Sequence, residues 1–287
     1  MMQSEQEGQR NLQQSGAAGQ RNTQHATNIK KRSMRRKKAR RMRRIKRIFV
    51  AAIILLVVFA AGRTSFVQGF LNHWNVKSEA TLTAEGYPES LVQLYEKNEE
   101  ARQFVLDYKK NGNNEQPIDI SSDVVDGKIP LFLQWDERWG YRTYGDNFLA
   151  ITGCGPTALS MVYVGLTGDT SMNPYAVAQM AQEDGFYVNG SGSSWSMMTE
   201  LATKLGLSAQ ELSLNEDSIR QELSQGHPII CIMGPGDFTT SGHFVVLTGV
   251  DSEGKITVND SNSKKNSNKA WKIEDLMSQI RDLWVYQ

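Results

Sequence analysis

An uncharged apolar run of 15 residues, Ile48 to Gly62, marks the border between two parts of the chain with opposite charge. Residues 1–47 carry 15 Lys or Arg against 2 Asp or Glu, a net charge of +13. Residues 48–287 carry 17 Lys or Arg against 29 Asp or Glu, a net charge of −12. The formal total of +1 therefore conceals a basic tail attached to a separate acidic domain.

The basic tail is a poor candidate for a folded domain. Residues 1–29 are rich in Gln, Asn, Ser and Gly and hold few large apolar side chains, so we expect a disordered segment. Residues 30–47 hold 13 Lys or Arg in 18 positions. Such a run can bind nucleic acid. Its place directly before an apolar run is instead typical of a membrane flank, so we expect no nucleic-acid partner.

We interpret residues 48–62 as a transmembrane signal anchor. A helix of these 15 residues is about 22 Å long at ~1.5 Å per residue, short against a hydrocarbon core of ~30 Å. Arg63 can extend its charge to the interface, and apolar character continues to Trp74, so the anchor can reach that residue. Since positive flanks stay inside, we expect a single-pass protein of the cell membrane with residues 1–47 in the cytoplasm and the C-terminal domain extracellular.

A cleavable signal peptide is the alternative interpretation of the apolar run. Val58-Phe59-Ala60 resembles a small-residue cleavage site. The charged region before the run is unusually long for a signal peptide, which favours a retained anchor. Under either interpretation, the C-terminal part of the chain is exported from the cytoplasm.

Residues 75–127 predict a linker and a helical spacer. Apolar side chains recur at three- and four-residue spacing from Pro88 to about Lys110, and Asn98 can divide this run into two helices. A turn-rich stretch follows and predicts a domain boundary near Gly127.

Residues 128–287 predict one α+β domain, and their 160 residues suffice for a sizeable core. A short strand is expected at 129–133. Helical patterns follow at 156–165, 174–182, 196–205 and 215–225. The period then changes to that of strands, at 229–233, 244–250 and 255–259. Helices followed by antiparallel strands are the order of an α+β fold.

One cysteine stands in a sequence typical of a nucleophile. Cys154 lies in Gly-Cys-Gly-Pro-Thr, directly before an apolar stretch that predicts a helix. A helix N-terminus lowers the pKa of a thiol, and the thiolate is the attacking species. The flanking glycines allow a tight turn that leaves the sulfur approachable and the Cys154 N–H free to face a developing oxyanion.

The second cysteine, Cys231, lies in an apolar run that predicts a buried strand. A structural disulfide between Cys154 and Cys231 is the alternative, because an oxidising compartment permits one. The surroundings of Cys154 favour the nucleophile.

A histidine and an aspartate follow on two strand-like runs joined by a four-residue turn. If Val250 pairs with Lys255, His243 lies opposite Asn262 and diagonal to Asp260, all on one face. The diagonal is about 7–8 Å between backbones, within reach of both side chains. Asp260 can therefore orient His243, and Asn262 is the nearest alternative orienter.

A carboxamide can complete such a site by binding the oxyanion. Gln134 lies 20 residues before Cys154, after the first predicted strand, and Asn147 competes for the role. No metal or cofactor site is expected, because the four histidines lack paired spacing and no CxxC occurs. Gly-Ser-Gly at 190–192 predicts a flexible turn rather than a phosphate loop.

Several motifs in chain order resemble a known family: IPLFLQWDERW, YGDN, GCGPTALSMV, LTGD, SGHFVVLTGV and ITVNDSN. The series, from residue 128 to about 275, resembles the papain-like cysteine peptidases that process double-glycine bacteriocin leaders, family thirty-nine of the cysteine peptidases. Within that family it is most similar to the stand-alone, exported branch of Gram-positive bacteria. The resemblance implies a papain-like fold, with Cys154 as nucleophile, His243 as general base and acid, Asp260 as orienter and Gln134 at the oxyanion hole.

The chain departs from that family in two respects. In leader-cleaving transporter domains the glutamine lies about half a dozen residues before the cysteine, whereas Gln134 lies 20 before Cys154. The sequence also shows no ATP-binding module or multi-span membrane domain, so leader cleavage coupled to transport is not implied.

We therefore expect a membrane-anchored extracytoplasmic cysteine peptidase that acts on a peptide or protein substrate. A cell-wall amidase or endopeptidase on the same fold, acting on cell-wall peptide, is one alternative. Such NlpC-type hydrolases usually orient the histidine with a second histidine, where this chain has Asp260. A non-catalytic papain-like binding module is the other alternative, and the intact Cys154, His243 and Asp260 count against it.

Overall fold

The structure, a computed structural model, describes residues 76–113 and 115–287. The predicted tail and the predicted anchor at 48–62 lie outside the described residues, so both stay predictions. Within the described ranges, no helix has the length and apolar character needed to cross a membrane.

The first described elements are helical: α3 (Glu79–Ala84), α4 (Glu89–Lys97), the short 3₁₀ helix η1 (Glu99–Ala101) and α5 (Arg102–Asn111). The helical run predicted from Pro88 is divided at Asn98, as the sequence indicated. Asn98 has an extended backbone, and its side-chain oxygen accepts a hydrogen bond from the Glu100 N–H. That bond satisfies a free donor at the start of the next helical turn.

These helices pack on the chain that follows them through a hydrophobic cluster. Leu91 and Phe104 enter it from the helices, and Tyr141 enters it from the later segment. The rings of Phe104 and Tyr141 stack with centroids 4.1 Å apart. Residues 77–287 form one compact unit, so the predicted boundary near Gly127 lies within that unit.

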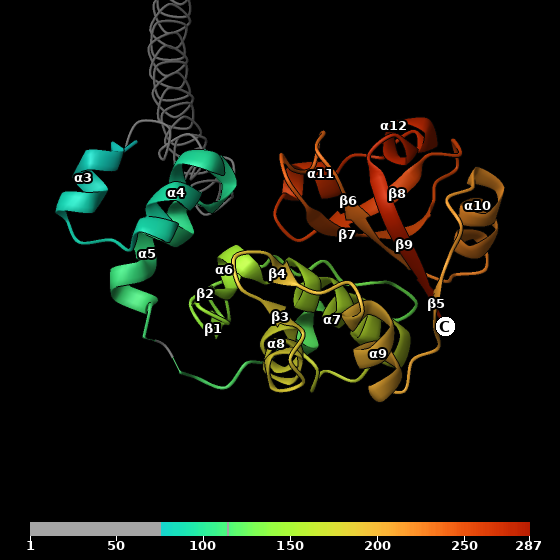
Figure 1. The fold of residues 1–287 in the computed structure, drawn as a ribbon, viewed down its shortest axis with the longest axis horizontal. Helices are drawn as coiled ribbons and strands as arrows, with labels where there is room; N and C mark the ends of the chain where they lie inside the picture. Colours follow the sequence, from blue (N-terminus) through green and yellow to red (C-terminus); the bar gives the residue numbers. More distant parts are fainter. Residues whose placement is uncertain (1–75, 114) are drawn as a thin grey trace, which may run out of the picture. The chain divides into compact units, whose positions relative to one another are not determined.

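The middle of the chain is built around helix α7 (Cys154–Thr167), which is buried on most sides (Figure 1). Gly168 ends it with a positive φ of 70°, a conformation that glycine adopts without a steric penalty. The surrounding elements are η2 (Ser121–Asp123), α6 (Leu149–Thr152), α8 (Pro174–Glu183) and α9 (Met197–Lys204), with two hairpins, β1 (Thr143–Tyr144) with β2 (Asn147–Phe148) and β3 (Tyr187–Val188) with β4 (Gly192–Ser193).

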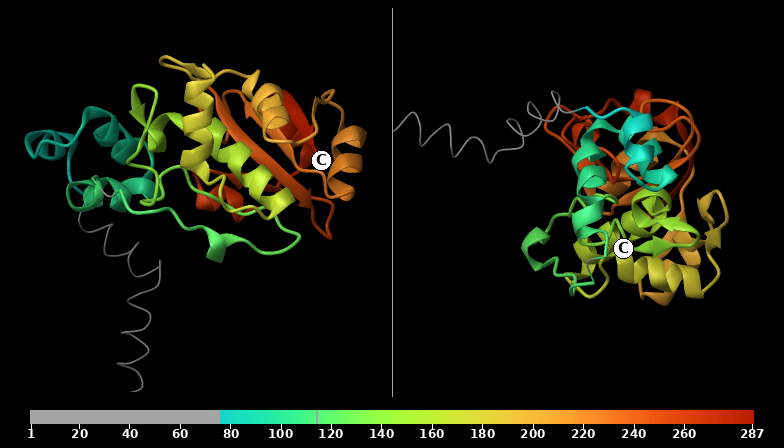
Figure 2. Two further views of the ribbon diagram at one scale, coloured as in Figure 1. Left: turned by 90° about the horizontal axis from the view of Figure 1, so that it is seen from below. Right: turned by 90° about the vertical axis from the view of Figure 1, so that its left-hand side faces the viewer.

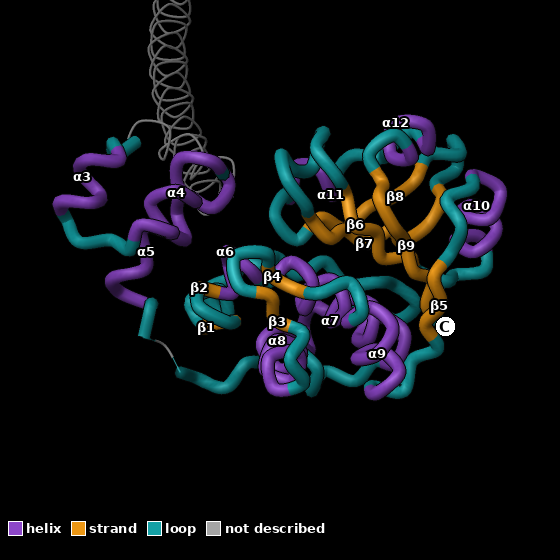
Figure 3. The backbone as a smooth tube through the Cα atoms, in the orientation of Figure 1, coloured by secondary structure: helices purple, strands orange, loops and turns teal. Residues whose placement is uncertain are grey.

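The C-terminal part forms a five-stranded antiparallel sheet in the order β5-β9-β6-β7-β8. Its strands are β5 (Ala209–Glu211), β6 (Ile229–Met233), β7 (His243–Val250), β8 (Ile256–Asp260) and β9 (Ile280–Tyr286). Three helices lie along this part of the chain: α10 (Glu216–Ser224), α11 (Lys264–Ser267) and α12 (Ile273–Met277). Figure 3 shows the strands gathered beside the helical layer. The predicted α+β fold is confirmed.

The two faces of the sheet bury different side chains. Ile230 and Phe244 pack with residues of α7 and α9, and Figure 2 shows those helices along one face of the sheet. Cys231 and Val245 point to the other face and pack with residues of α10 and α12. Successive residues of a strand alternate between faces, so the sequence fixes which side chains meet α7.

Two predicted details of the strands are wrong. Residues 129–133 form no strand; Pro130 has no N–H to donate, and its carbonyl accepts a side-chain hydrogen bond from Asn259 at 3.0 Å. In the β7–β8 hairpin, Val250 pairs with Ile256 rather than with the lysine before it.

The register at the far end of the hairpin nevertheless agrees with the prediction, because Val245 lies opposite Asp260. The register shifts between Leu247 and Gly249, where β7 holds one extra residue. This β-bulge offsets the longer turn. The unpredicted extra residue in the turn and the unpredicted bulge therefore cancel, and the pairing is as predicted at the end of the hairpin that carries His243 and Asp260.

Candidate active site

Three elements bring the predicted site residues together. Cys154 is the first residue of α7, His243 is the first residue of β7, and Asp260 is the last residue of β8. Helix α7 packs against β7, and Cys154 at the start of the helix lines the same pocket as His243 at the start of the strand.

The backbone around Cys154 is tightly packed, although the residue as a whole is partly exposed. A Cβ atom added to Gly155 would lie 2.7 Å from the Ser193 hydroxyl oxygen, closer than real Cβ contacts allow. Glycine at this position therefore lets the β3–β4 hairpin approach the start of α7 and form a wall beside the thiol.

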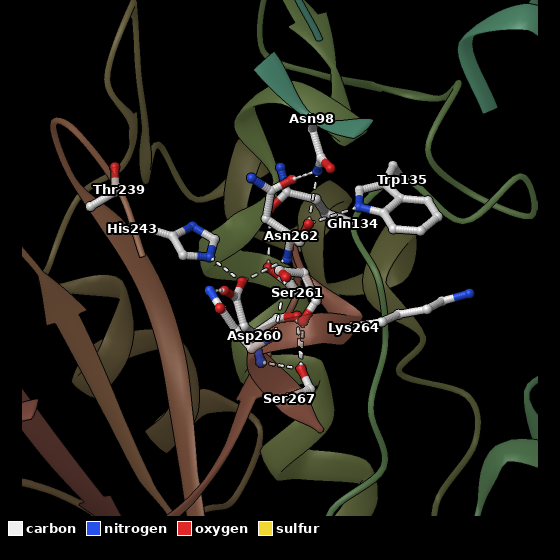
Figure 4. Close-up of polar contacts among 12 residues, drawn as sticks. Asn98, Gln134, Trp135, Thr239, His243, Asp260, Ser261, Asn262, Lys264 and Ser267 are labelled. Carbon is white, nitrogen blue, oxygen red and sulfur yellow. Dashed lines mark hydrogen bonds and ion pairs between the residues drawn. The ribbon is translucent and has the colours of Figure 1, made fainter. Parts of the chain in front are cut away.

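His243 and Asp260 form a buried pair. The His243 Nε2 atom lies 2.7 Å from Asp260 Oδ1, and their side chains are 7% and 1% exposed (Figure 4). Asp260 Oδ1 also accepts from the Asn262 N–H at 2.8 Å, and Oδ2 accepts from Asn266 Nδ2 at 2.8 Å. Both carboxylate oxygens are thus fixed, and Nδ1 is the imidazole nitrogen left for Cys154.

The charges of these three groups support one another. Burial alone would raise the pKa of Cys154, but the hydrogen bond and charge of His243, with the N–H groups of Phe244 and Gly155, outweigh it and lower that pKa. Burial likewise opposes the imidazolium, yet bonds to Asp260 and Cys154 raise the pKa of His243 to about 10. The pKa of Asp260 is lowered, because the contacts with His243 outweigh burial. All three pKa shifts therefore favour the charged form of the group concerned.

The loop after β8 is held by the N-terminal helices. Asn98 Nδ2 donates to the Asn262 carbonyl at 2.8 Å and to its side-chain oxygen at 2.9 Å, and Trp135 Nε1 donates to the same carbonyl at 3.1 Å (Figure 4). The Glu100 carboxylate accepts from the Lys264 N–H at 2.9 Å, next to the start of α11. The Asn262 side chain is therefore engaged with Asn98, whereas Asp260 contacts His243.

Gln134 is bound elsewhere. Its Nε2 atom donates to the Ala150 carbonyl at 2.7 Å, and its Oε1 atom accepts from the Ser261 hydroxyl at 3.0 Å. The side chain is buried and does not line the pocket at Cys154. These contacts join the segment before α6 to the loop after β8, and the oxyanion role stays a prediction.

Asn147, the alternative oxyanion donor, does not line that pocket either. Its Oδ1 atom accepts from the adjacent Phe148 N–H at 2.8 Å. Ser193 lies closer to the chemistry, because it lines the pocket and approaches Gly155. Its hydroxyl bonds to the Tyr144 hydroxyl at 2.8 Å.

A pocket of about 340 Å³ opens beside Cys154 and His243. Its walls come from the β3–β4 hairpin, the end of β6 with the following loop, and β9. The sequence did not predict the lining residues Ser193, Trp195 and Arg281. One wall had a signal in the sequence, the Gly-Ser-Gly turn at 190–192. The sequence alone predicts only a flexible turn there, but Gly190 and Ser191 line the pocket.

The disulfide alternative is wrong, because both cysteines are free thiols. Cys154 packs toward the α7 face of the sheet, while Cys231 lies in β6 and points to the opposite face. Burial raises the pKa of the Cys231 thiol far above its ordinary value. Among the described residues, no group of three or more His, Cys, Asp or Glu is placed to hold a metal ion.

Comparisons with known proteins point to one family. Residues 127–287 match the model of the Peptidase_C39 like family. A solved structure, the peptidase domain of Streptococcus ComA, a bifunctional ABC transporter involved in a quorum-sensing pathway, is 19% identical; the match covers 47% of this chain and 89% of that one. The TM-score between the two structures is 0.34. No curated protein matches the sequence.

Proposed function

Because the chain belongs to the Peptidase_C39 like family, we propose that it is a cysteine peptidase that hydrolyses a peptide or protein substrate. The observation that carries this proposal is the placement of Cys154 beside His243 in one pocket, with His243 bonded to the buried Asp260. It connects a thiol at the start of a helix to a histidine and a buried carboxylate, and the adjoining pocket gives a substrate carbonyl access to the sulfur.

Cys154 is the nucleophile of the proposed reaction. Its thiolate attacks the carbonyl carbon of the scissile bond while His243 holds the proton. His243 then donates that proton to the leaving amine, the carbon–nitrogen bond breaks, and a thioester remains on Cys154. A water molecule loses a proton to His243 and attacks the thioester, which releases the acid and restores the thiolate–imidazolium pair.

Asp260 acts on the reaction through His243. Its bond to Nε2 fixes the orientation of the ring and directs Nδ1 toward the thiol. Its negative charge stabilises the imidazolium that both steps require.

The oxyanion requires donors close to Cys154. As the first residue of α7, Cys154 has an N–H that precedes the hydrogen-bond ladder of the helix and is available to the substrate. The Ser193 hydroxyl lines the same pocket and suits the role of second donor. Gln134 is the weaker choice, because Ala150 and Ser261 already engage both ends of its carboxamide.

A cleavage assay with the full-length protein tests the function. The substrate is a mixture of random hexapeptides carrying a fluorophore and a quencher. Cys154→Ala and His243→Ala should each abolish hydrolysis, and the double variant should be no worse, because the two residues act as one unit. Cys231→Ala is the matched control and should retain activity. Full cleavage by Cys154→Ala would eliminate the thiol mechanism.

We further propose that the peptidase domain faces outward from the cell membrane. The proposal rests on the net charge of +13 before the apolar run 48–62. Protease added to protoplasts should remove the C-terminal domain and spare the tail. Protection of that domain in intact protoplasts would overturn the proposed location.

A further inference from the structure

The pocket beside Cys154 carries a cation on one wall. Arg281 lies in β9, where the pairing with β6 is irregular: Ile232 pairs with Asp282, but Met233 pairs with Ile280. Arg281 is the extra residue of this bulge. Bulges redirect a side chain and are frequent next to active sites. Here the bulge places an arginine on the lining of the pocket.

The backbone opposite Arg281 is shaped to receive its side chain. A Cβ atom added to Gly234 would lie 2.3 Å from Arg281 Nε, so any larger residue would displace the arginine. Arg281 therefore lies directly over the chain at the end of β6, where the loop that leads to His243 begins. A buried carboxamide steadies that loop, because Gln279 Oε1 accepts from the Asp237 N–H and Gln279 Nε2 donates to the Asp237 carboxylate at 2.8 Å.

No counter-ion accompanies Arg281 within residues 76–113 and 115–287. It is exposed and forms no ion pair with those residues. The neighbouring Asp282 accepts from the Leu283 N–H through Oδ1 at 2.8 Å. The described lining holds no Asp, Glu or Lys, so Arg281 is its one charged side chain besides the Cys154–His243 pair.

We propose that Arg281 binds a carboxylate of the substrate close to the scissile bond, so that this enzyme selects peptides with an acidic group beside the cleavage site. The inference rests on the proposed function. A guanidinium recognises a carboxylate through paired N–H donors, which ammonium cannot reproduce. Residues 48–287 carry a net charge of −12, so the domain as a whole does not attract acidic peptides. Selection of an acidic substrate therefore depends on the local positive charge of Arg281.

A second wall of the pocket sets the rest of the selectivity. The Trp195 side chain is 47% exposed, unusual for a tryptophan, and its ring meets Trp284 edge-on with centroids 6.3 Å apart. Trp284 is buried and holds the exposed ring in place. The pocket thus offers a fixed aromatic surface together with the cation, which suits a peptide with an apolar side chain near its carboxylate.

The experiment compares matched fluorogenic hexapeptides with the full-length protein. Glu or Gln is placed in turn at each of the three positions on either side of the scissile bond. At one position, Glu should give about tenfold higher kcat/KM than Gln, through a lower KM. Arg281→Met should remove this preference, Arg281→Lys should retain part of it, and Arg281→Glu should favour a Lys peptide instead.

The control variant is Lys128→Met, which removes one exposed positive charge that lies outside the pocket lining and should keep the Glu preference. Peptides with free and amidated C-termini form a second arm. A preference confined to free termini identifies the terminal carboxylate as the bound group, and a preference present in both identifies the side chain.

The outcomes separate the inference from the function on which it rests. If Arg281→Met cleaves Glu and Gln peptides in the same ratio as the unaltered protein, the inference is wrong and the peptidase stands. If the unaltered protein cleaves no peptide and a thiol-directed peptide probe does not label Cys154, the proposed function fails and the inference fails with it.

Discussion

At the scale of single residues, the charge on Cys154 is set by contacts that act against its burial. The pKa of Cys154 is lowered and that of His243 is raised to about 10, so alkylation of Cys154 should stay fast well below the free-thiol pKa of ~8.5. Asp260→Asn removes the charge that stabilises the imidazolium and should move the midpoint of the alkylation profile to higher pH. The measurement is the rate of iodoacetamide labelling against pH, followed by peptide mass spectrometry.

The two cysteines provide the control for that profile. Cys231 is fully buried in β6 and should react only after unfolding. Cys231→Ala should leave the Cys154 midpoint unchanged. Equal and slow labelling of both thiols in the folded protein would contradict the thiolate–imidazolium pair.

The oxyanion donor is a second prediction at this scale. Ser193→Ala should lower kcat by about 10²–10³-fold, the usual loss for one donor, with little change in KM. Gln134→Ala should instead reduce stability, because the Ala150 carbonyl and the Ser261 hydroxyl lose their partners. Steady-state kinetics and urea unfolding of both variants distinguish the roles. Loss of kcat in Gln134→Ala at unchanged stability would restore the role predicted from the sequence.

Local patterns explain which site residues could be predicted. Cys154 stands at a glycine-flanked helix start, and His243 and Asp260 stand on one hairpin, so period and spacing were enough to select these three candidates. Ser193 and Arg281 depend on a short hairpin and a bulge, which have no repeating pattern in the sequence. Only the folded chain brings them to the thiol.

At the scale of elements, the β7–β8 hairpin shows how a correct pairing can come from an incorrect turn. The predicted four-residue turn was one residue too short, and the bulge between Leu247 and Gly249 restores the pairing of Val245 with Asp260. A bulge leaves no signal in the alternation of apolar residues. Hairpin geometry near a site can therefore be predicted only to within one residue.

The break between α4 and α5 has a consequence for Asp260. Asn98 at this break holds the Asn262 backbone, and Glu100 holds the start of α11. Asn98→Ala removes two hydrogen bonds and should lower the free energy of unfolding by about 1–2 kcal/mol. It should also move the Cys154 alkylation midpoint to higher pH, since the loop that fixes Asp260 loosens.

The matched variant for this test is Gln103→Ala, which alters an exposed side chain on α5 that bonds only to Asp107 among the described residues. It should change neither stability nor the alkylation profile. A profile of Asn98→Ala that overlays the unaltered protein would show that the loop is fixed without this contact.

At the scale of the whole molecule, the spacer and the family-matched region 127–287 pack together. Phe104 is 3% exposed and stacks on Tyr141, which belongs to the matched region. Phe104→Ala should cost about 3–5 kcal/mol of stability, as for other buried phenylalanines. Urea unfolding should show one cooperative transition at a lower midpoint. A separate early transition for the spacer would mean that it unfolds independently.

Among the described residues, the order of helices and strands along the chain was the most predictable property. Helical patterns followed by strand patterns predicted the α+β fold. Apolar residues recur about every 3.6 positions in a helix and every 2 positions in a strand, so the sequence itself distinguishes the two. The boundary near Gly127 rests on local composition and stays a prediction, and the rings of Phe104 and Tyr141 stack across it. Contacts between distant segments have no periodic signal.

The most direct test of the central claim is detection of the thioester on Cys154. The full-length protein is mixed with an activated peptide ester, quenched in acid within milliseconds to seconds, digested and examined by mass spectrometry. We predict an acyl adduct on the peptide that contains Cys154 and no such adduct in Cys154→Ala. Hydrolysis of the ester by the unaltered protein without any adduct on Cys154, or an adduct on Cys231 alone, would contradict the account.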